Sequence, residues 1–321
     1  MMLVKFPDFS TLSAQEQDEY WAQGWFRNSN TLLCLRMVCI DEQLFSLLKI
    51  RLPLQGYKMS KSLRKICKQN KNFEVRIGKA TLTEEMERLY EQHLHRFKGH
   101  ISASLKEFFI DPFDAQFFNT YEVSIFDEGE LIAFSFFDKG EESIASIMGI
   151  FDHRYSKHSL GLYTMLCEVQ NAILEGKKYY YPGYVLHKKS SFDYKLRLGN
   201  YQYYTWKKWV SAEKFSKSNL DIYKLNKGVK TAEKTLQNSG IKYERKLYPY
   251  FSFGYIKEGV YDFVESPICL ILKRYSDHFL ILEYILEKRA YRLSQVGMAS
   301  EFKVILDKYT EDKPQNSVKE N

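Results

Sequence analysis

The middle of the chain alternates short apolar runs with turn residues. Three runs rich in β-branched and aromatic residues span residues 121–126, 131–137 and 143–151. They are separated by Asp127-Glu128-Gly129 and by Lys139-Gly140, which are typical hairpin residues. The pattern therefore predicts three antiparallel strands joined by two hairpins.

After these three strands, the apolar residues recur at the three- and four-residue spacing of a helix. A helix is expected to begin at an N-cap Ser159 and to stop at Gly176, because one face between them is apolar: Leu162, Leu166, Val169 and Ile173. Another strand is predicted over residues 179–186. A meander, a helix and a further strand form the central pattern of the α+β acyltransferase fold of the GNAT N-acetyltransferases, an analogy that rests on element order alone.

A second helix is predicted over residues 82–97. Thr83 stands as a cap before an acidic first turn, and the apolar spacing that follows includes Met86, Leu89, Tyr90, His93 and Phe97. Two interpretations exist for His93 and His95, a metal site or partly buried polar side chains. No third ligand stands nearby in the sequence, which favours packing.

The sequence changes character beyond Trp209. Residues 212–240 are polar and helix-prone, and two apolar segments follow at 266–275 and 278–293. The charged tail at 310–321 has no apolar anchors, so it is expected to be disordered.

Composition narrows the class of protein. The chain has 321 residues, 45% apolar and 16% aromatic, which is enough for a folded protein of about two domains. Its five cysteines form no CxxC pair, which argues against a disulfide framework or a zinc site and fits a reducing compartment. The longest apolar run, residues 268–272, is far shorter than the roughly 20 residues of a membrane span, and the N-terminus lacks a signal-peptide core. We therefore expect a soluble, cytoplasmic protein without a membrane partner.

The charge balance favours an acidic or phosphate-bearing partner. Lys and Arg number 47 against 40 Asp and Glu, a net charge of +7. Between residues 52 and 73 no acidic residue occurs while six cations gather: Lys58, Lys61, Arg64, Lys65, Lys68 and Lys71. This density suits contact with a nucleic-acid backbone, and the alternative is a solvated helix face.

The bend before the helix at 159–176 bears on the choice of acyl donor. An acyl-CoA enzyme of this fold normally has a glycine-rich turn there that cradles pyrophosphate. The segment FDHRYSKHSLGLY holds only Gly161, already inside the helix, so acyl-CoA is disfavoured. Arg154, Lys157 and His158 stand beside the positive helix end. They suit another phosphate, such as the end of a nucleic acid, or are ordinary surface residues.

The segment YYYPGYVLHKKSSFDYK, residues 179–195, concentrates phenol, imidazole and ammonium groups. No GxSxG motif occurs, so covalent catalysis is not indicated. Transfer from an activated ester to an amine needs only proximity, proton removal and oxyanion stabilisation. Each tyrosine either packs with its hydroxyl paired or faces a cleft, whereas His187 and Lys195 lie beyond the strand and are expected to be exposed to a cleft.

Several ordered motifs together resemble a known family. The strongest are YYYPGY at residues 179–184, followed at the family spacing by Tyr194-Lys195, and the pattern of Asp152 with Ser-Leu-Gly-x-Tyr at 159–163. The fragments GWFR, RLPLQGYKMSKSLRKICKQN and LYEQHLHRFKGH add weaker support. Over most of residues 20–206 the chain resembles the arginyl-tRNA–protein transferases, together with the bacterial leucyl-tRNA–protein transferases that share their domain.

The resemblance implies an enzyme with a GNAT-like catalytic domain that uses aminoacyl-tRNA and needs no acyl-CoA or other cofactor. Such an enzyme adds arginine or leucine to the N-terminus of acceptor proteins that begin with an acidic residue, which marks them for degradation. It would divide the chain into an N-terminal region at 1–78, a catalytic domain at 79–210 and a C-terminal extension at 211–321.

The resemblance also assigns site residues. Those carried over as catalytic are Tyr181, His187 and Lys195. Together with the residue patterns above, it gives these substrate-binding candidates: Lys61, Arg64, Lys65, Lys68, Arg154, Ser159, Gly183, Tyr184, Tyr194 and Arg197. The basic ones at 61–68 would contact tRNA, and Lys195 or Arg197 would pair with the carboxylate of the recipient.

The chain also departs from the family pattern. The N-terminal cysteine cluster is reduced to Cys39, with Cys34 nearby, so no metal or iron–sulfur site is expected. Ser191 stands where the family has a lysine, and Gly199-Asn200 replaces an Arg-Pro pair. Three hypotheses stay open: an aminoacyl-tRNA–protein transferase, a GNAT-type N-acyltransferase using acyl-CoA or an acyl carrier, and a non-catalytic RNA- or protein-binding module.

Overall fold

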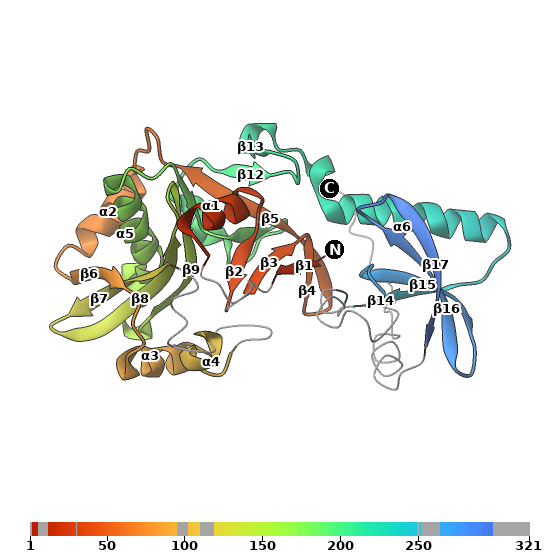
Figure 1. Cartoon of the computed structure of the whole chain (residues 1–321), viewed down its shortest axis with the longest axis horizontal. Helices are drawn as coiled ribbons and strands as arrows, with labels where there is room; N and C mark the ends of the chain where they lie inside the picture. The colour runs from red at the N-terminus through yellow and green to blue at the C-terminus, as the bar shows by residue number, and fades with distance from the viewer. Residues whose placement is uncertain are drawn as a thin grey trace. The chain divides into compact units, whose positions relative to one another are not determined.

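The computed structural model (Figure 1) describes residues 2–5, 12–29, 31–94, 102–109, 119–248, 251 and 264–297. The chain divides into two compact units. The larger unit comprises Val4–Cys34 and Leu47–Phe215, and the smaller unit comprises Met1–Leu3, Leu35–Ser46 and Ser216–Asn321. The tail expected to be disordered lies outside the described residues.

The larger unit is built on a long mixed sheet. Its strands follow the order β13-β12-β5-β10-β9-β8-β7-β6, and neighbours are antiparallel except for β9 and β10, which are parallel. A further strand, β11, also pairs with β5, which enters this unit at Leu47. The bounds are β5 Gln43–Pro53, β6 Glu74–Lys79, β7 Thr120–Asp127, β8 Glu130–Lys139, β9 Ser143–Phe151, β10 Tyr179–Tyr181, β11 Tyr184–Leu186, β12 Gln202–Tyr204 and β13 Trp209–Ser211.

Helices cover both faces of this sheet (Figure 1). One apolar cluster joins α2 and α5 to the sheet, and a separate cluster joins α3 and α4 to it. Phe134 and Phe136 of β8 belong to the second cluster and Ala133 and Phe137 to the first, so the two clusters lie on opposite faces. The helices are α1 Ala14–Ala22, α2 Lys61–Gln69, α3 Glu84–Leu94, α4 Leu105–Phe109 and α5 Leu160–Leu174, with short 3₁₀ segments η2 His153–His158, η3 Asp193–Leu198 and η4 Ala212–Lys214. A small sheet of order β1-β3-β2 is made by Met2–Lys5, Thr31–Leu35 and Phe26–Asn28.

The predicted meander and both predicted helix starts have counterparts in the structure. Strands β7, β8 and β9 pair in two hairpins, and α5 follows them. The Met86 N–H donates to Thr83 Oγ1 over 3.2 Å at the start of α3. Gly176, with φ +69°, ends α5 as predicted, and the next N–H bonds back to Ala172 O over 2.9 Å. This element order is that of the α+β, GNAT-like class.

One predicted strand is wrong, and the N-cap predicted for α5 is confirmed in its position but not in its hydrogen bond. The strand predicted over residues 179–186 is broken, because Pro182 has no N–H to donate and Gly183 adopts φ +85°. The register against β5 shifts by one residue across the break, from Tyr180 opposite Leu52 to Tyr184 opposite Lys49, which defines a bulge. Ser159 precedes α5, but it is left-handed (φ 54°, ψ 41°) and its hydroxyl makes no capping bond.

The smaller unit is an antiparallel sheet with one long helix. The strands follow the order β14-β15-β16-β17, and β15 and β16 lie within the two apolar segments noted beyond residue 260. Gly228 lets α6 approach this sheet, because a Cβ there would meet the Tyr284 ring in β16. The bounds are β4 Met37–Ile40, η5 Lys217–Asn219, α6 Asp221–Asn238, β14 Glu244–Leu247, β15 Ile268–Arg274, β16 His278–Ile285 and β17 Ala290–Gly297. No helix in the described part of the chain is both long and apolar enough to span a membrane.

Candidate active site

The two parallel strands of the larger unit separate soon after they meet. They pair over three residues only, with Tyr179, Tyr180 and Tyr181 opposite residues 143–145. Beyond Ala145, β9 continues along β8, whereas the chain after Tyr181 bulges at Pro182-Gly183 and rejoins β5. An opening at the carboxyl ends of adjacent parallel strands is a common position for ligand sites in α/β proteins.

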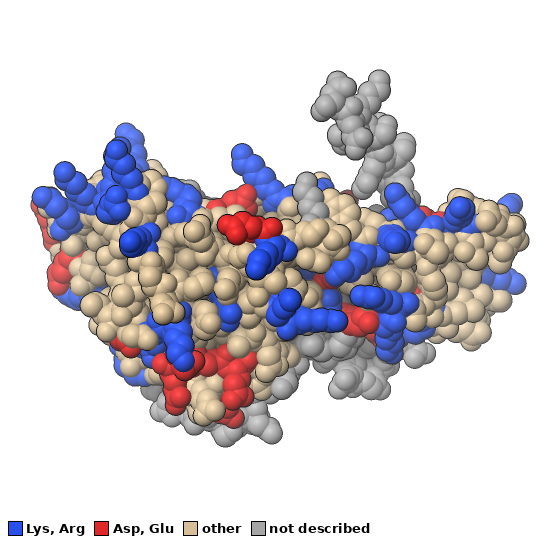
Figure 2. All heavy atoms as spheres, turned by 90° about the horizontal axis from the view of Figure 1, so that it is seen from above, with Lys and Arg blue, Asp and Glu red and all other residues tan. Residues whose placement is uncertain are grey.

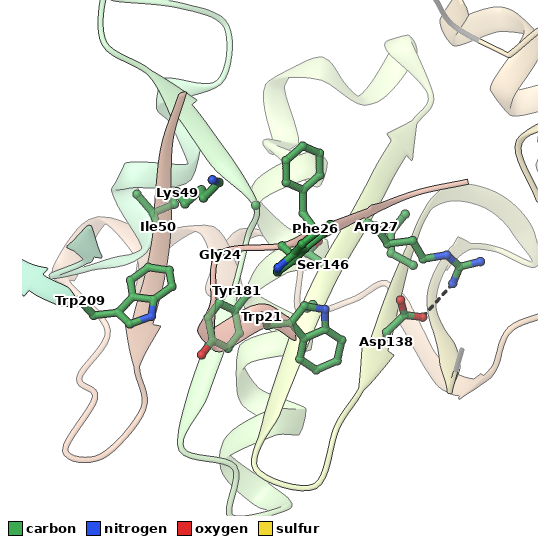
Figure 3. Close-up of a pocket in the computed structure, with 14 residues that line it drawn as sticks. Trp21, Gly24, Phe26, Arg27, Lys49, Ile50, Asp138, Ser146, Tyr181 and Trp209 are labelled. Atoms are coloured by element: carbon green, nitrogen blue, oxygen red, sulfur yellow. Dashed lines mark hydrogen bonds and ion pairs between the residues drawn. The ribbon is translucent and has the colours of Figure 1, made fainter. Parts of the chain in front are cut away.

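A pocket lies at this separation and has aromatic walls (Figure 3). Figure 3 shows Trp21, Tyr181 and Trp209 close together, with ring centroids 6.1 Å apart for the first pair and 5.7 Å for the second. The side chain of Trp209 is fixed by a 2.8 Å hydrogen bond from its Nε1 to Ala22 O. Flat apolar faces of this kind suit a nucleobase or an apolar side chain. The pocket is lined by Trp21, Gly24, Trp25, Phe26, Arg27, Lys49, Ile50, Asp138, Ala145, Ser146, Ile147, Tyr181, Gly183 and Trp209.

Two cations of β5 are held against these aromatic rings. The Lys49 Nζ lies 3.3 Å from the centroid of Trp206 and 3.3 Å from Cys34 Sγ. The Arg51 guanidinium lies 3.9 Å from the Tyr179 centroid and 4.7 Å from the Trp209 centroid, and it donates to Tyr181 Oη over 3.4 Å. Stacking on ring faces keeps this positive charge beside the pocket.

A buried ion pair closes the opposite side of the pocket. Arg27 Nη1 lies 2.9 Å from Asp138 Oδ1, and both side chains are almost fully buried. Thr120 Oγ1 donates to the same carboxylate oxygen over 2.6 Å. Burial raises the pKa of Asp138 and lowers that of Arg27, and their mutual attraction opposes both shifts. The second oxygen, Asp138 Oδ2, is buried without a hydrogen-bond partner among the described residues.

A second buried carboxylate lies behind the pocket. Glu168, on α5, is fully buried and accepts hydrogen bonds from Ser135 Oγ over 2.5 Å and Tyr180 Oη over 2.7 Å. The next residue after Tyr180, Tyr181, lines the pocket. Burial raises the pKa of Glu168 to about 7, although the hydrogen bonds lower it.

Lys195 approaches the same region from η3. Its Nζ donates to Pro182 O over 2.9 Å and contacts Tyr184 O at 3.5 Å, so it bridges the carbonyls on either side of Gly183. Burial lowers the pKa of Lys195 to about 8, against the favourable charge of Glu168. The ammonium group therefore supports the bulge, rather than lying open to a cleft as expected from the sequence.

The other predicted cleft residues divide into two groups. Tyr181 and Gly183 line the pocket. Tyr184 is half-buried and packs on Phe26, with ring centroids 5.2 Å apart. His187 is half-buried, Tyr194 is 41% exposed and Arg197 is exposed, and none of the three lines the pocket. Burial, followed by the charge of Lys188, lowers the pKa of His187.

The predicted basic run forms the outer face of α2. Leu63 and Ile66 are buried on its inner face, whereas the predicted contacts Lys61, Arg64, Lys65 and Lys68 are exposed. Figure 2 shows Lys and Arg gathered at the end of the larger unit that carries α2 in Figure 1. The end of α2 is tied to η2, because Asn70 Nδ2 donates to His158 O over 3.0 Å. This arrangement brings the exposed cations close to the start of α5.

Arg154 and Ser159, the two phosphate contacts predicted before α5, both have other roles in the structure. Arg154 Nε donates to Asp152 Oδ2 over 2.8 Å, and its Nη2 pairs with Glu130. Its positive charge is thus already balanced by two carboxylates. Ser159 makes the left-handed turn into α5, and its hydroxyl caps no N–H there.

Metal ligation finds no support in the described ranges, where no group of three or more His, Cys, Asp or Glu side chains could hold an ion. His93 is buried, and its Nδ1 lies 3.3 Å from Phe151 O, which agrees with the packing interpretation. His95 lies outside the described residues.

The sequence reasoning missed several residues of this site. Glu168 is the only charged residue of α5, and a carboxylate next to buried apolar positions was an available signal. No local signal marks Trp21, Arg51, Ser146 or Trp209, because strand pairing and side-chain packing bring them together from distant segments.

The α+β fold, with its pocket where β9 and β10 separate, is of the GNAT-like class, and comparisons with known proteins narrow the resemblance to a family. A model of the family "Arginine-tRNA-protein transferase, C terminus" matches residues 85–205. The resemblance seen in the sequence is thus confirmed for residues 85–205, which match the C-terminal domain of this family.

Curated relatives extend the match beyond this domain. An aspartate/glutamate leucyltransferase of Helicobacter hepaticus is 29% identical over 185 residues, which are 54% of this chain and 73% of the relative. One of Campylobacter jejuni is 27% identical over 198 residues, 60% of this chain and 81% of the relative. Among solved structures, a tandem GNAT protein from the clavulanic acid biosynthesis pathway aligns with 63% of this chain and 60% of its own, at 11% identity and a TM-score of 0.35.

Proposed function

We propose that this protein moves an amino acid from a charged tRNA to the N-terminal amine of a protein that begins with Asp or Glu. The observation that carries the proposal is the pocket at the separation of β9 and β10, with aromatic walls, stacked cations and a buried carboxylate behind it. The names of the relatives, aspartate/glutamate leucyltransferases, support the acidic acceptor.

The reaction needs few groups from the protein. The amine nitrogen attacks the ester carbonyl, a C–N bond forms, and the C–O bond to the terminal ribose breaks. Since the ester is already activated, positioning and proton transfer supply the catalysis. Trp21, Tyr181 and Trp209 would stack on the terminal adenine or hold the apolar part of the donated amino acid.

The other residues assigned from the sequence also have roles in the proposed reaction. The exposed cations of α2 would contact tRNA phosphates. Gly183, without a side chain, would leave room for the ester, while Lys195 holds the bulge around it. Arg197 is exposed and would pair with the acidic acceptor side chain, and His187 and Tyr194 would contact the acceptor outside the pocket.

We favour leucine over arginine as the donated residue. The pocket wall is largely aromatic and aliphatic, and its buried acid, Asp138, is already paired with Arg27. A long cationic side chain would meet a carboxylate whose charge Arg27 already balances. The modified acceptors would then be marked for degradation in the cytoplasm.

The test is a donor-by-acceptor assay. Radiolabelled Leu-tRNA and Arg-tRNA are each incubated with the protein and with peptides that begin with Asp, Glu or Ala. Label is expected on the Asp and Glu peptides with Leu-tRNA, and the Ala peptide is the matched control. Label that stays on tRNA with every donor would overturn the proposal, and label from acetyl-CoA would favour the acyl-CoA hypothesis instead.

A further inference from the structure

The buried ion pair of Arg27 and Asp138 offers a binding position for the donor substrate. We propose that Asp138 binds the α-ammonium group of the donated amino acid through its carboxylate oxygen Oδ2, a role that rests on the proposed transfer function. The contact would fix the aminoacyl ester in the pocket by a group that every unmodified aminoacyl-tRNA carries.

The two oxygens of Asp138 are used unequally. Oδ1 accepts hydrogen bonds from Arg27 Nη1 over 2.9 Å and from Thr120 Oγ1 over 2.6 Å. Oδ2 is buried and has no hydrogen-bond partner among the residues that the structure describes. A buried acceptor without a donor is costly, and such groups are few in native proteins. Oδ2 is therefore suited to a hydrogen-bond donor that a ligand brings.

The sheet register places Asp138 at the position of the proposed reaction. It stands opposite Ala145, the last residue of β9 that pairs with β10. Residues opposite each other on antiparallel strands share a face of the sheet, and both of these line the pocket together with Tyr181 and Gly183. Figure 3 shows one oxygen of Asp138 bonded to Arg27 and the other directed away from it. A donor bound at Oδ2 would thus lie on the pocket side of the ion pair.

The charge of Asp138 decides which kind of donor suits it. Burial raises the pKa of this carboxyl group, whereas the charge of Arg27 and the hydrogen bonds to Oδ1 favour the ionised form. A cation at Oδ2 would favour the ionised carboxylate further. Hydrogen bonds from an ammonium group to a carboxylate are shorter and stronger than those between neutral groups. A small ammonium group is therefore a better match than a neutral amide or hydroxyl.

Two amines meet in the proposed reaction, and only one of them can keep its charge. The amine of the acceptor protein must be neutral to attack the ester, so a carboxylate that stabilises its ammonium form would slow the reaction. The α-amino group of the donated residue does not react. Its positive charge also withdraws electrons from the neighbouring ester carbonyl, which favours attack there. The α-ammonium group of the donated residue is thus the one that suits Asp138.

This contact would also restrict the choice of donor. Oδ1 is held by Arg27 and Thr120, and Oδ2 would be taken by the α-ammonium group, so Asp138 has no oxygen left for the guanidinium of an arginine donor. An N-acylated aminoacyl-tRNA, whose α-nitrogen carries no charge, would be a poor donor for the same reason.

The decisive experiment compares two donors in two proteins. Leu-tRNA is compared with tRNA that carries 4-methylpentanoate, which is the leucine acyl group without its α-amine. The ratio of the two kcat/KM values is measured in the parent protein and in Asp138→Asn, so that the different reactivities of the two esters cancel. The ratio should be about 10- to 100-fold larger in the parent protein, because the variant loses a hydrogen bond to a charged group. An equal ratio in the two proteins would overturn the inference.

Glu168→Gln provides the matched control. It makes the same change from carboxylate to amide in a fully buried acid that does not line the pocket. The ratio of the two donors should stay within about twofold of that in the parent protein. An equal fall of the ratio in both variants would show that the preference does not come from Asp138 and would contradict the inference.

A binding measurement on the parent protein does not depend on the folding of any variant. Two non-reactive adenosine derivatives are compared, one with leucine and one with 4-methylpentanoate joined to a 3′ nitrogen by an amide bond. The leucine derivative should bind about 10- to 100-fold more tightly, since it alone carries the ammonium group. Equal affinities would contradict the contact with Asp138.

Failure of the inference can be told apart from failure of the proposed function. A parent protein that is inactive with every aminoacyl-tRNA would remove the function. An active parent protein whose preference for Leu-tRNA over the 4-methylpentanoate donor is unchanged in Asp138→Asn would leave the function in place and remove the contact.

Discussion

The larger unit places charge in two contrasting ways. Around the pocket, Arg27, Asp138, Glu168 and Lys195 are buried or half-buried, and each is held by named partners at fixed distances. Along the outer face of α2, the cations of residues 61–68 are exposed, and no ion pair is recorded for them among the described residues. Buried charge is costly and therefore specific to one chemistry, whereas exposed charge acts at long range and tolerates substitution. The two regions should respond differently to mutation.

The buried ion pair should give the largest effect on stability. Arg27→Ala leaves Asp138 buried without its cation, which should cost about 3–5 kcal/mol of unfolding free energy. All four tryptophans of the chain lie in the larger unit, so tryptophan fluorescence during denaturant unfolding follows that unit. The exposed pair of Arg76 with Glu74 provides the control, and Arg76→Ala should change the unfolding free energy by less than about 1 kcal/mol. Similar losses of unfolding free energy in Arg27→Ala and Arg76→Ala would contradict the distinction between buried and exposed charge.

The pH dependence of stability should reveal Glu168. Its pKa in the folded protein, about 7, lies above the ordinary 4.5, so the folded state holds the proton over a range where the unfolded state has lost it. The unfolding free energy should therefore fall by about 3 kcal/mol on this account as the pH rises from about 4.5 through 7. Glu168→Gln should remove this fall.

A matched exposed acid sharpens the pH measurement. Glu74 is exposed, and hydrogen bonds from Arg76 lower its pKa, so Glu74→Gln should leave the fall between pH 4.5 and 7 in place. An identical pH dependence in Glu168→Gln and the parent protein would show that Glu168 is not the group responsible.

The features that the sequence predicts correctly are those that have a local signal. The strands β7 to β9, the stop of α5 at Gly176 and the exposed cations of α2 all have local signals: alternation, a glycine and a run without acids. The bulge at Pro182-Gly183 was missed, although the proline already argues against an uninterrupted strand.

The pocket could not have been assembled from local patterns. Trp21 comes from α1, Arg51 from β5 and Trp209 from β13, and only the strand order of the sheet makes them neighbours. Lys195 was expected in an open cleft because it follows an apolar run. Its contacts with the carbonyls of Pro182 and Tyr184 depend on the bulge, which the sequence pattern did not predict.

The exposed region should change affinity for tRNA without changing stability. Replacing Lys61, Arg64 and Lys65 by Ala should weaken tRNA binding and reduce the slope of log K against log salt by about 2 to 3. The melting temperature should stay close to that of the parent protein, because none of the three takes part in an ion pair recorded for the described residues. Binding measured over a series of salt concentrations gives the slope.

The chain offers a control with the same loss of charge. Lys227, Lys230 and Lys234 are exposed on α6 of the smaller unit. If tRNA is recognised at α2, their replacement by Ala should leave the salt slope nearly unchanged. Equal reductions in the two triple variants would mean that the effect follows net charge and not position.

A loss of stability smaller than that at the buried ion pair, together with a specific effect on the site, is expected at Gly183. Its φ of +85° costs an alanine about 1–2 kcal/mol, and a Cβ there would lie 3.7 Å from Lys195 Nζ, an ordinary contact, so the strain is in the backbone. Gly129, in the hairpin between β7 and β8, has nearly the same φ of +86° and open space around it. Gly183→Ala and Gly129→Ala should therefore lower the unfolding free energy by similar amounts, while only Gly183→Ala lowers the rate of aminoacyl transfer. Equal transfer rates in the two variants would show that the bulge at Gly183 does not contribute to aminoacyl transfer.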